Sequence, residues 1–162
     1  MSDLQIYLRE KISFSIPINF IEGSKKNYFV FKPYINIQSK EKRYLEIIVK
    51  ELKLMNTQII SVKKVTSKTM YKIAIQNFDD IENALKELSN YLFFEKSKEQ
   101  AYLRFKEVFA MIKMLPKTNV EYDERFDEIL EKRLLINVNR RAVEKPEITI
   151  KKIKTFLEKN NI

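Results

Sequence analysis

At 162 residues, of which 44% are apolar, the chain is long enough to bury one hydrophobic core and too short to need two. The absence of Cys and His excludes disulfides, thiol nucleophiles, Cys/His zinc sites and imidazole bases. No stretch approaches the roughly 18 apolar residues that cross a bilayer, and the N-terminal stretch has no signal-peptide layout. We therefore expect a soluble, intracellular protein with one domain (residues 1–162) and no membrane partner.

The formal net charge is +9, and its distribution is uneven. Residues 24–76 contain 12 Lys and Arg residues against 3 acidic residues. The basic residues are Lys25, Lys26, Lys32, Lys40, Lys42, Arg43, Lys50, Lys53, Lys63, Lys64, Lys68 and Lys72. This concentration favours a polyanionic partner, although a Lys-rich surface that is merely solvated is the alternative interpretation.

The N-terminal part predicts a short helix at 2–12, followed by apolar segments that proline interrupts. Residues 14–20 are apolar but broken at Pro17. Residues 28–38 are aromatic and β-branched with Pro33 in their middle, which predicts two short strands or one bent edge strand.

The middle of the chain predicts a helix and then a β-hairpin. Residues 40–55 place Tyr44, Leu45 and Ile48 on one side at helical spacing. Residues 58–66 and 68–76 alternate between apolar and polar side chains, as the two strands of a hairpin with one solvated face do.

The second half predicts helices only. The amphipathic segments are 79–93, 95–115, 122–136 and 146–159. Asp79 or Asp80 can cap the first of them, Pro116 stops the second, and Pro146 suits the first turn of the last. The last two form a C-terminal helical extension at about 122–162.

Together these elements predict an α+β fold in which helices cover one face of a four-stranded antiparallel sheet. The other face would be free, and lysines and hydroxyl groups on it would form a basic surface that follows phosphates.

The chain contains four short segments in a characteristic order: 20–24 (FIEGS), 33–43 (PYINIQSKEKR), 96–101 (KSKEQA) and 114–116 (MLP). Their order and spacing resemble the single-motif class of LAGLIDADG homing endonucleases. A weaker likeness continues from Phe126 to the final helix, so the resemblance covers nearly the whole chain. It implies a LAGLIDADG-like αββαββα fold with additional C-terminal helices, whose sheet grips a duplex across the major groove.

In active members of that family, two carboxylates hold divalent metal ions that activate water for phosphodiester hydrolysis. Carried over by position, Glu22 would be the catalytic, metal-binding carboxylate and Gln38 the polar residue at the margin of the active site. Lys42 would be a basic residue beside it, and Lys96 or Lys98 would be the basic helper near the scissile phosphate. A solvated turn residue is the alternative interpretation of Glu22.

The chain also departs from the family pattern. Only one acidic residue precedes Gly23, and 17–19 (PIN) stands where the motif helix carries the small residues that let two copies cross. The segment 22–38 is short for the long first hairpin that reads DNA bases. These departures predict a degenerate member without cleavage activity, and they make a homodimer doubtful.

The leading hypothesis is therefore a non-catalytic protein that binds structured RNA and needs no cofactor. It would be an intron maturase or a component of a ribonucleoprotein such as an organellar ribosome, alongside other proteins, with the mitochondrion as the suspected compartment. Tyr28, Phe29, Phe31 and Tyr34 could stack on unpaired bases or could form a half-buried strand pair. The alternative is an active, Mg²⁺-dependent homing endonuclease that cleaves double-stranded DNA with Glu22, Gln38 and Lys98. A third hypothesis is a basic scaffold for protein or acidic lipid.

Both nucleic-acid hypotheses use the same contact residues. These are Lys25, Lys26, Lys32, Lys40, Lys42, Arg43, Lys63, Lys64, Lys68, Lys72, Arg140 and Arg141. For Arg140 and Arg141, the solvated side of a terminal helix is the equally plain interpretation.

Overall fold

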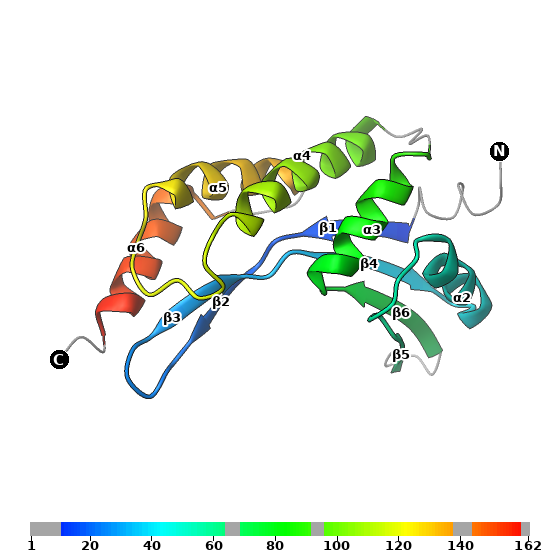
Figure 1. The fold of residues 1–162 in the computed structure, drawn as a ribbon, viewed down its shortest axis with the longest axis horizontal. Coiled ribbons are helices and arrows are strands. Elements are labelled where there is room, and N and C mark those ends of the chain that lie inside the picture. The colour runs from blue at the N-terminus through cyan, green and yellow to red at the C-terminus, as the bar shows by residue number, and fades with distance from the viewer. Residues whose placement is uncertain (1–10, 64–68, 92–95, 138–143, 160–162) are drawn as a thin grey trace. The chain divides into compact units, whose positions relative to one another are not determined.

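The computed structural model describes residues 11–63, 69–91, 96–137 and 144–159 (Figure 1). Contacts divide the chain into two compact units. The first contains the described residues of 1–15 and 34–100, and the second those of 16–33 and 101–162. The organisation as a single domain stays a prediction, and residues 2–10 of the first predicted helix lie outside the described ranges.

The first unit contains a four-stranded antiparallel sheet. Its strands are β1 (Ile12–Ser15), β4 (Tyr34–Ser39), β6 (Thr69–Ile75) and β5 (Ile59–Lys63), in this spatial order. The predicted hairpin is confirmed as β5 and β6, while residues 64–68 between them are outside the described part of the chain.

The strand register sorts the side chains of this sheet onto two faces. Ile37 lies between Ile12 and Ile73, and all three side chains are fully buried. Helix α2 (Lys42–Glu51) contacts β4, β5 and β6 and buries Leu45 and Ile48. The helix predicted at 40–55 is thus confirmed with a shorter range, and its apolar side covers the isoleucine face of the sheet.

Helix α3 (Phe78–Leu88) begins at a cap that the sequence analysis missed. The Asn77 side chain accepts hydrogen bonds from the backbone N–H groups of Asp79 (3.0 Å) and Asp80 (3.2 Å). The predicted cap at Asp79 or Asp80 is therefore wrong. Asn77 occupies the position that lets a side-chain oxygen reach the free N–H groups of the first turn.

Pro17 and Pro33 each lie in a short break between two strands. Residues 16–17 separate β1 from β2 (Ile18–Ile21), and residues 32–33 separate β3 (Tyr28–Phe31) from β4. Strands β2 and β3 form a two-stranded antiparallel sheet in the second unit, where the Lys32 N–H also donates to the Pro17 carbonyl at 2.9 Å. Of the two alternatives for 28–38, the pair of short strands is confirmed, because proline offers no N–H to a strand ladder.

Three helices complete the described chain: α4 (Lys96–Lys113), α5 (Arg125–Leu134) and α6 (Pro146–Glu158), with a 3-10 turn at Leu135–Asn137. All three lie within the ranges predicted for them, and Pro146 is in the first turn of α6 as predicted. In the second unit Phe126 of α5 packs edge-on against Phe29 and Phe31, at ring distances of 5.2 and 5.8 Å. None of the helices in the described ranges is long and apolar enough to cross a membrane.

Candidate nucleic-acid interface

The face of the four-stranded sheet opposite the isoleucines is open. Because side chains alternate along each strand, ten described residues direct their side chains to this face, and most of them are small, amide-bearing or apolar. They are Ser13, Ser15, Tyr34, Asn36, Gln38, Ile60, Val62, Met70, Lys72 and Ala74. Gln38 and Ile60 are exposed and the others are half-buried, so this face borders solvent while its reverse forms the core.

Cross-strand pairing brings the polar members of this face together. Asn36 lies between Ser13 and Ala74, and Lys72 lies between Gln38 and Ile60. Directly paired side chains on one face of an antiparallel sheet are close enough to touch the same ligand. Asn and Gln side chains match the edge of adenine, Lys matches guanine, Ser either base, and apolar groups match the thymine methyl. The face therefore carries a set of groups suited to reading base edges.

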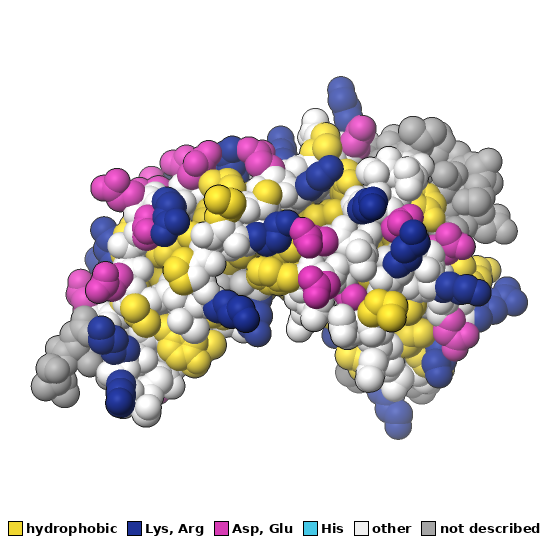
Figure 2. Space-filling model, in the orientation of Figure 1, with side chains coloured by type: hydrophobic (Ala, Val, Ile, Leu, Met, Phe, Trp, Pro, Cys, Tyr) yellow, Lys and Arg dark blue, Asp and Glu magenta, His cyan; other side chains and the backbone are white. Residues whose placement is uncertain are grey.

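The cations predicted for this face mostly lie elsewhere. Among the described members of the predicted contact set, only Lys72 is on the open face of the four-stranded sheet. For the described residues of the four strands, the prediction of a lysine-covered face is therefore wrong. Figure 2 shows one side of the molecule, on which Lys and Arg side chains lie among acidic and apolar ones.

The register explains where the neighbouring cations are. Lys63 pairs with Thr69 and shares its side of β5 with Ile59, so it belongs to the helix-covered face. Lys40, Lys42 and Arg43 lie at the start of α2 and are exposed. Arg43 pairs with Glu41 at 3.1 Å, and its hydrogen bond to Tyr44 and the charge of Glu41 raise its pKa. The predicted contacts Lys64, Lys68, Arg140 and Arg141 fall outside the described residues.

The remaining predicted cations belong to the hairpin of the second unit. Lys25 and Lys26 are exposed in its tip, between β2 and β3. The only glycine, Gly23, lies in the same turn, where an added Cβ would stand 2.3 Å from the Lys26 carbonyl oxygen. Lys32 is exposed directly after β3. These cations can contact phosphates, but they flank strands and do not cover them.

The aromatic residues of β3 and β4 divide between core and surface. Phe29 and Phe31 are buried and pack in the second unit, as the alternative of a half-buried strand pair predicts for part of the set. Tyr28 and Tyr34 are half-buried. Base stacking by Phe29 or Phe31 would require the hairpin core to open.

Two of the three predicted catalytic residues, Gln38 and Lys98, belong to the first unit. The Lys98 ammonium group donates to the carbonyl of Ile12 on β1, whose strand partner Ile37 precedes Gln38 on β4. The Gln38 side chain is on the open face of the sheet. Glu22 belongs to the second unit, in the hairpin tip.

The alignment that selected Glu22 assumed that a motif helix ends there. Strand β2 precedes Glu22 instead, so the carry-over by position was wrong in this respect. For the same reason, residues 17–19 are not part of a helix, so they say nothing about the crossing of two motif helices. The absence of cleavage and the doubtful homodimer stay predictions.

In proteins, Mg²⁺ is held by one or two carboxylates together with waters and substrate phosphates. Within the described ranges no three His, Cys, Asp or Glu side chains gather closely enough to hold a metal ion. Mg²⁺ as a cofactor stays a prediction, and we derive no hydrolytic step from these residues.

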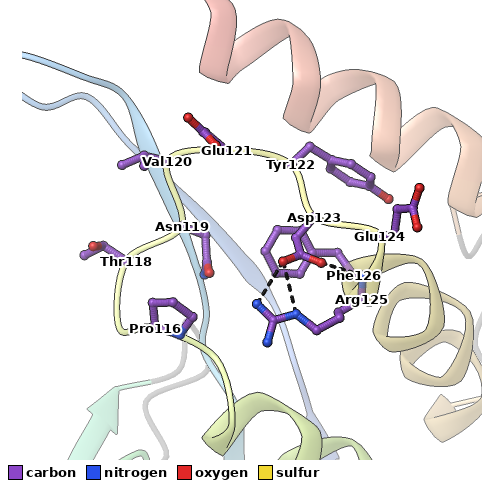
Figure 3. Close-up of a pocket in the computed structure, with 10 residues that line it drawn as sticks. All are labelled: Pro116, Thr118, Asn119, Val120, Glu121, Tyr122, Asp123, Glu124, Arg125 and Phe126. Carbon is purple, nitrogen blue, oxygen red and sulfur yellow. Dashed lines mark hydrogen bonds and ion pairs between the residues drawn. The ribbon is translucent and has the colours of Figure 1, made fainter.

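A cavity of about 450 Å³ lies in the loop before α5, in the second unit (Figure 3). The contacts of its lining residues hold this loop in place. The backbone of Asn119 exchanges two hydrogen bonds with that of Phe29, which ties the loop to β3. Asp123 accepts from the Arg125 guanidinium at 2.8 and 3.0 Å, and these bonds lower its pKa. Glu121, Asp123 and Glu124 make the lining acidic, so it does not suit a polyanion.

Sequence reasoning missed most side chains of the open face. Asn36 and Ser13 alternate with buried Ile and Phe residues, and this period of two was the available signal. The concentration of lysines drew the prediction instead, whereas the open face carries mainly amide, hydroxyl and apolar groups.

No family model matches the chain, and no curated protein matches it. Solved structures do. An archaeal intron-encoded homing endonuclease complexed with DNA, I-Vdi141I, superposes with a TM-score of 0.71 at 16% identity, over 98% of this chain and 94% of its own. The homing endonuclease I-TnaI superposes with a TM-score of 0.65 at 15% sequence identity, over 93% of this chain and 95% of its own. The LAGLIDADG meganuclease I-AabMI bound to uncleaved DNA superposes with a TM-score of 0.64 at 18% sequence identity, over 93% of this chain and 48% of its own. The chain therefore has the LAGLIDADG homing-endonuclease fold that its sequence resemblance predicts.

Proposed function

We propose that the chain binds double-stranded DNA, with the open face of the four-stranded sheet directed at the base edges. The observation that carries the proposal is the cross-strand arrangement of Asn36, Gln38 and Lys72 on that face. These are the side chains that form paired hydrogen bonds with purines. The DNA complexes of similarly folded proteins, such as I-AabMI, support the same assignment.

Groove geometry favours DNA over duplex RNA as the ligand. The major groove of B-DNA, about 12 Å wide, admits a two-stranded β-ribbon. The major groove of A-form RNA is too deep and narrow for side chains to read. Strands β4 and β6 carry the polar set on adjacent, paired positions, which suits the wider groove. Structured RNA, the ligand favoured from the sequence, is the competing outcome.

The direct test is selection of bound sequences from a random duplex DNA library by the full chain. We expect an enriched motif, and we expect Asn36→Ala and Gln38→Ala to relax the preference at separate positions of that motif. Each variant should cost about 1–3 kcal/mol of discrimination at its position. The matched control is Ser61→Ala, an exposed change on the reverse side of the sheet. Tighter binding of structured RNA, unaffected by either variant, would refute the proposal.

DNA cleavage is a second candidate, since Gln38, a predicted active-site residue, lies on the proposed DNA-binding face. A nicking assay on the selected duplex with Mg²⁺ tests it. If nicking occurs, Glu22→Gln tests the assignment of Glu22 as the metal-binding carboxylate, which predicts that the substitution abolishes nicking. An unchanged rate would contradict that assignment.

A further inference from the structure

Helix α6 and strand β2 border an open groove in the second unit, away from the proposed DNA-binding strands in sequence. The groove has a volume of about 550 Å³ and is lined by Phe20, Ile148, Lys151, Lys152, Thr155, Phe156 and Lys159. Phe20 and Ile148 are 41% and 48% exposed. Phe20 meets Phe156 edge-on at 5.0 Å. The floor is thus apolar and accessible.

The lining residues of α6 form one side of the helix. Ile148, Lys152, Thr155 and Lys159 follow one another at intervals of four, three and four residues, the spacing of a helix-packing seam. The side that faces the core uses other positions, among them Ile153 and Leu157, which are buried. Thr155 is small and central, so a second helix could approach α6 closely there.

Three cations edge the groove, and among the residues that the structure describes no acidic side chain lines it. Lys151, Lys152 and Lys159 are all exposed. Lys152 already holds one carboxylate at the edge, because Glu144 approaches its ammonium group to 2.5 Å. This ion pair lowers the pKa of Glu144. The groove therefore combines an apolar floor with positive edges that accept carboxylates.

We propose that this groove binds an acidic amphipathic helix of a protein partner. The apolar side of such a helix would cover Phe20 and Ile148, and its acidic flanks would pair with the edge lysines. The helical spacing of the lining argues for a helix as the occupant.

The test measures binding of the full chain to a fluorescent helical peptide of about 18 residues, with Leu along one side and Glu on both flanks. We expect Ile148→Asp to weaken binding about tenfold or more, because it replaces an apolar contact by a like charge. Asp in the first turn of a helix is favourable, so this variant should fold. Lys151→Glu with Lys159→Glu should weaken binding at least as much.

The charge-matched control is Lys106→Glu with Lys117→Glu, two exposed lysines of the same unit that do not line the groove. It should retain the affinity of the parent chain within about twofold. Equal losses in the control and in the groove variants would overturn the proposal. So would absence of peptide binding, or displacement of the peptide by single-stranded oligo(U). Because the groove and the sheet face share no residue, failure here leaves the proposed DNA binding intact.

Discussion

At the residue scale, Asp80 is the polar side chain on which the local structure of the first unit depends most. It is fully buried and accepts hydrogen bonds from the backbone N–H groups of Met55 and Asn56, both at 2.9 Å. The Thr57 hydroxyl donates a third bond at 2.6 Å. One carboxylate thus fixes the segment between α2 and β5 to α3.

We expect Asp80→Ala to lower the free energy of unfolding by about 3 kcal/mol, because it leaves buried donors without an acceptor. Urea denaturation measures this loss. The neighbouring Asp79→Ala is the control and should cost well below 1 kcal/mol, since Asp79 is exposed. Similar losses in both variants would show that the carboxylate network does not stabilise the fold.

The contribution of Asp80 also depends on pH. Burial raises its pKa, but hydrogen bonds from Thr57, Met55 and Asn56 outweigh burial and lower the pKa below its usual value. A carboxyl group with a lowered folded pKa contributes fully above its unfolded pKa of about 3.9. That contribution is lost as the pH falls through the folded pKa. The stability difference between the parent chain and Asp80→Ala should therefore shrink in acid, and a difference that grew in acid would contradict this.

Sequence reasoning identified the helix at Asp80 but not the role of the residue. Asn77, Asp79 and Asp80 are all good capping residues, so composition alone cannot choose among them. In the structure Asn77 caps the helix, and the Asp80 carboxylate instead accepts hydrogen bonds from a loop some 25 residues earlier. That pairing becomes visible only in three dimensions.

At the element scale, the hairpin tip between β2 and β3 requires its glycine. We expect Gly23→Ala to lower the free energy of unfolding by about 1–3 kcal/mol, because the new methyl group would meet the Lys26 carbonyl oxygen. A shift in Tm measures it, with the exposed Ser24→Ala as control. An unchanged Tm for Gly23→Ala would mean that the turn has a different shape.

The same tip shows why a short motif misled the sequence analysis. Phe-Ile-Glu-Gly-Ser fits the end of a motif helix and a hairpin turn equally well, since Gly and Ser are common in both. The proline at position 17 was the local signal against a helix, and the pairing of Ile21 with Tyr28 decides for the hairpin.

At the scale of the whole molecule, the type and order of the elements from residue 28 onward could be predicted, because hydrophobic periodicity is a local property. Strands β1 and β2 were not predicted, and Ile12, placed in a helix from the sequence, begins β1. The faces on which charges lie could not be predicted, because they depend on strand register. A shift of one residue moves every side chain to the opposite face. Lys63 and Lys72 illustrate this: both are strand lysines of one basic segment, yet the register directs them to opposite sides of the sheet.

The most direct test of the account compares Lys72→Glu with Lys63→Glu in duplex DNA binding over a range of salt concentrations. The two substitutions change the charge equally and lie on adjacent strands. We expect Lys72→Glu to weaken binding about tenfold or more and to make the dependence on salt shallower, with an effect of about threefold or less for Lys63→Glu. Equal losses, or a greater loss with Lys63→Glu, would contradict the assignment of the open face as the DNA-binding surface.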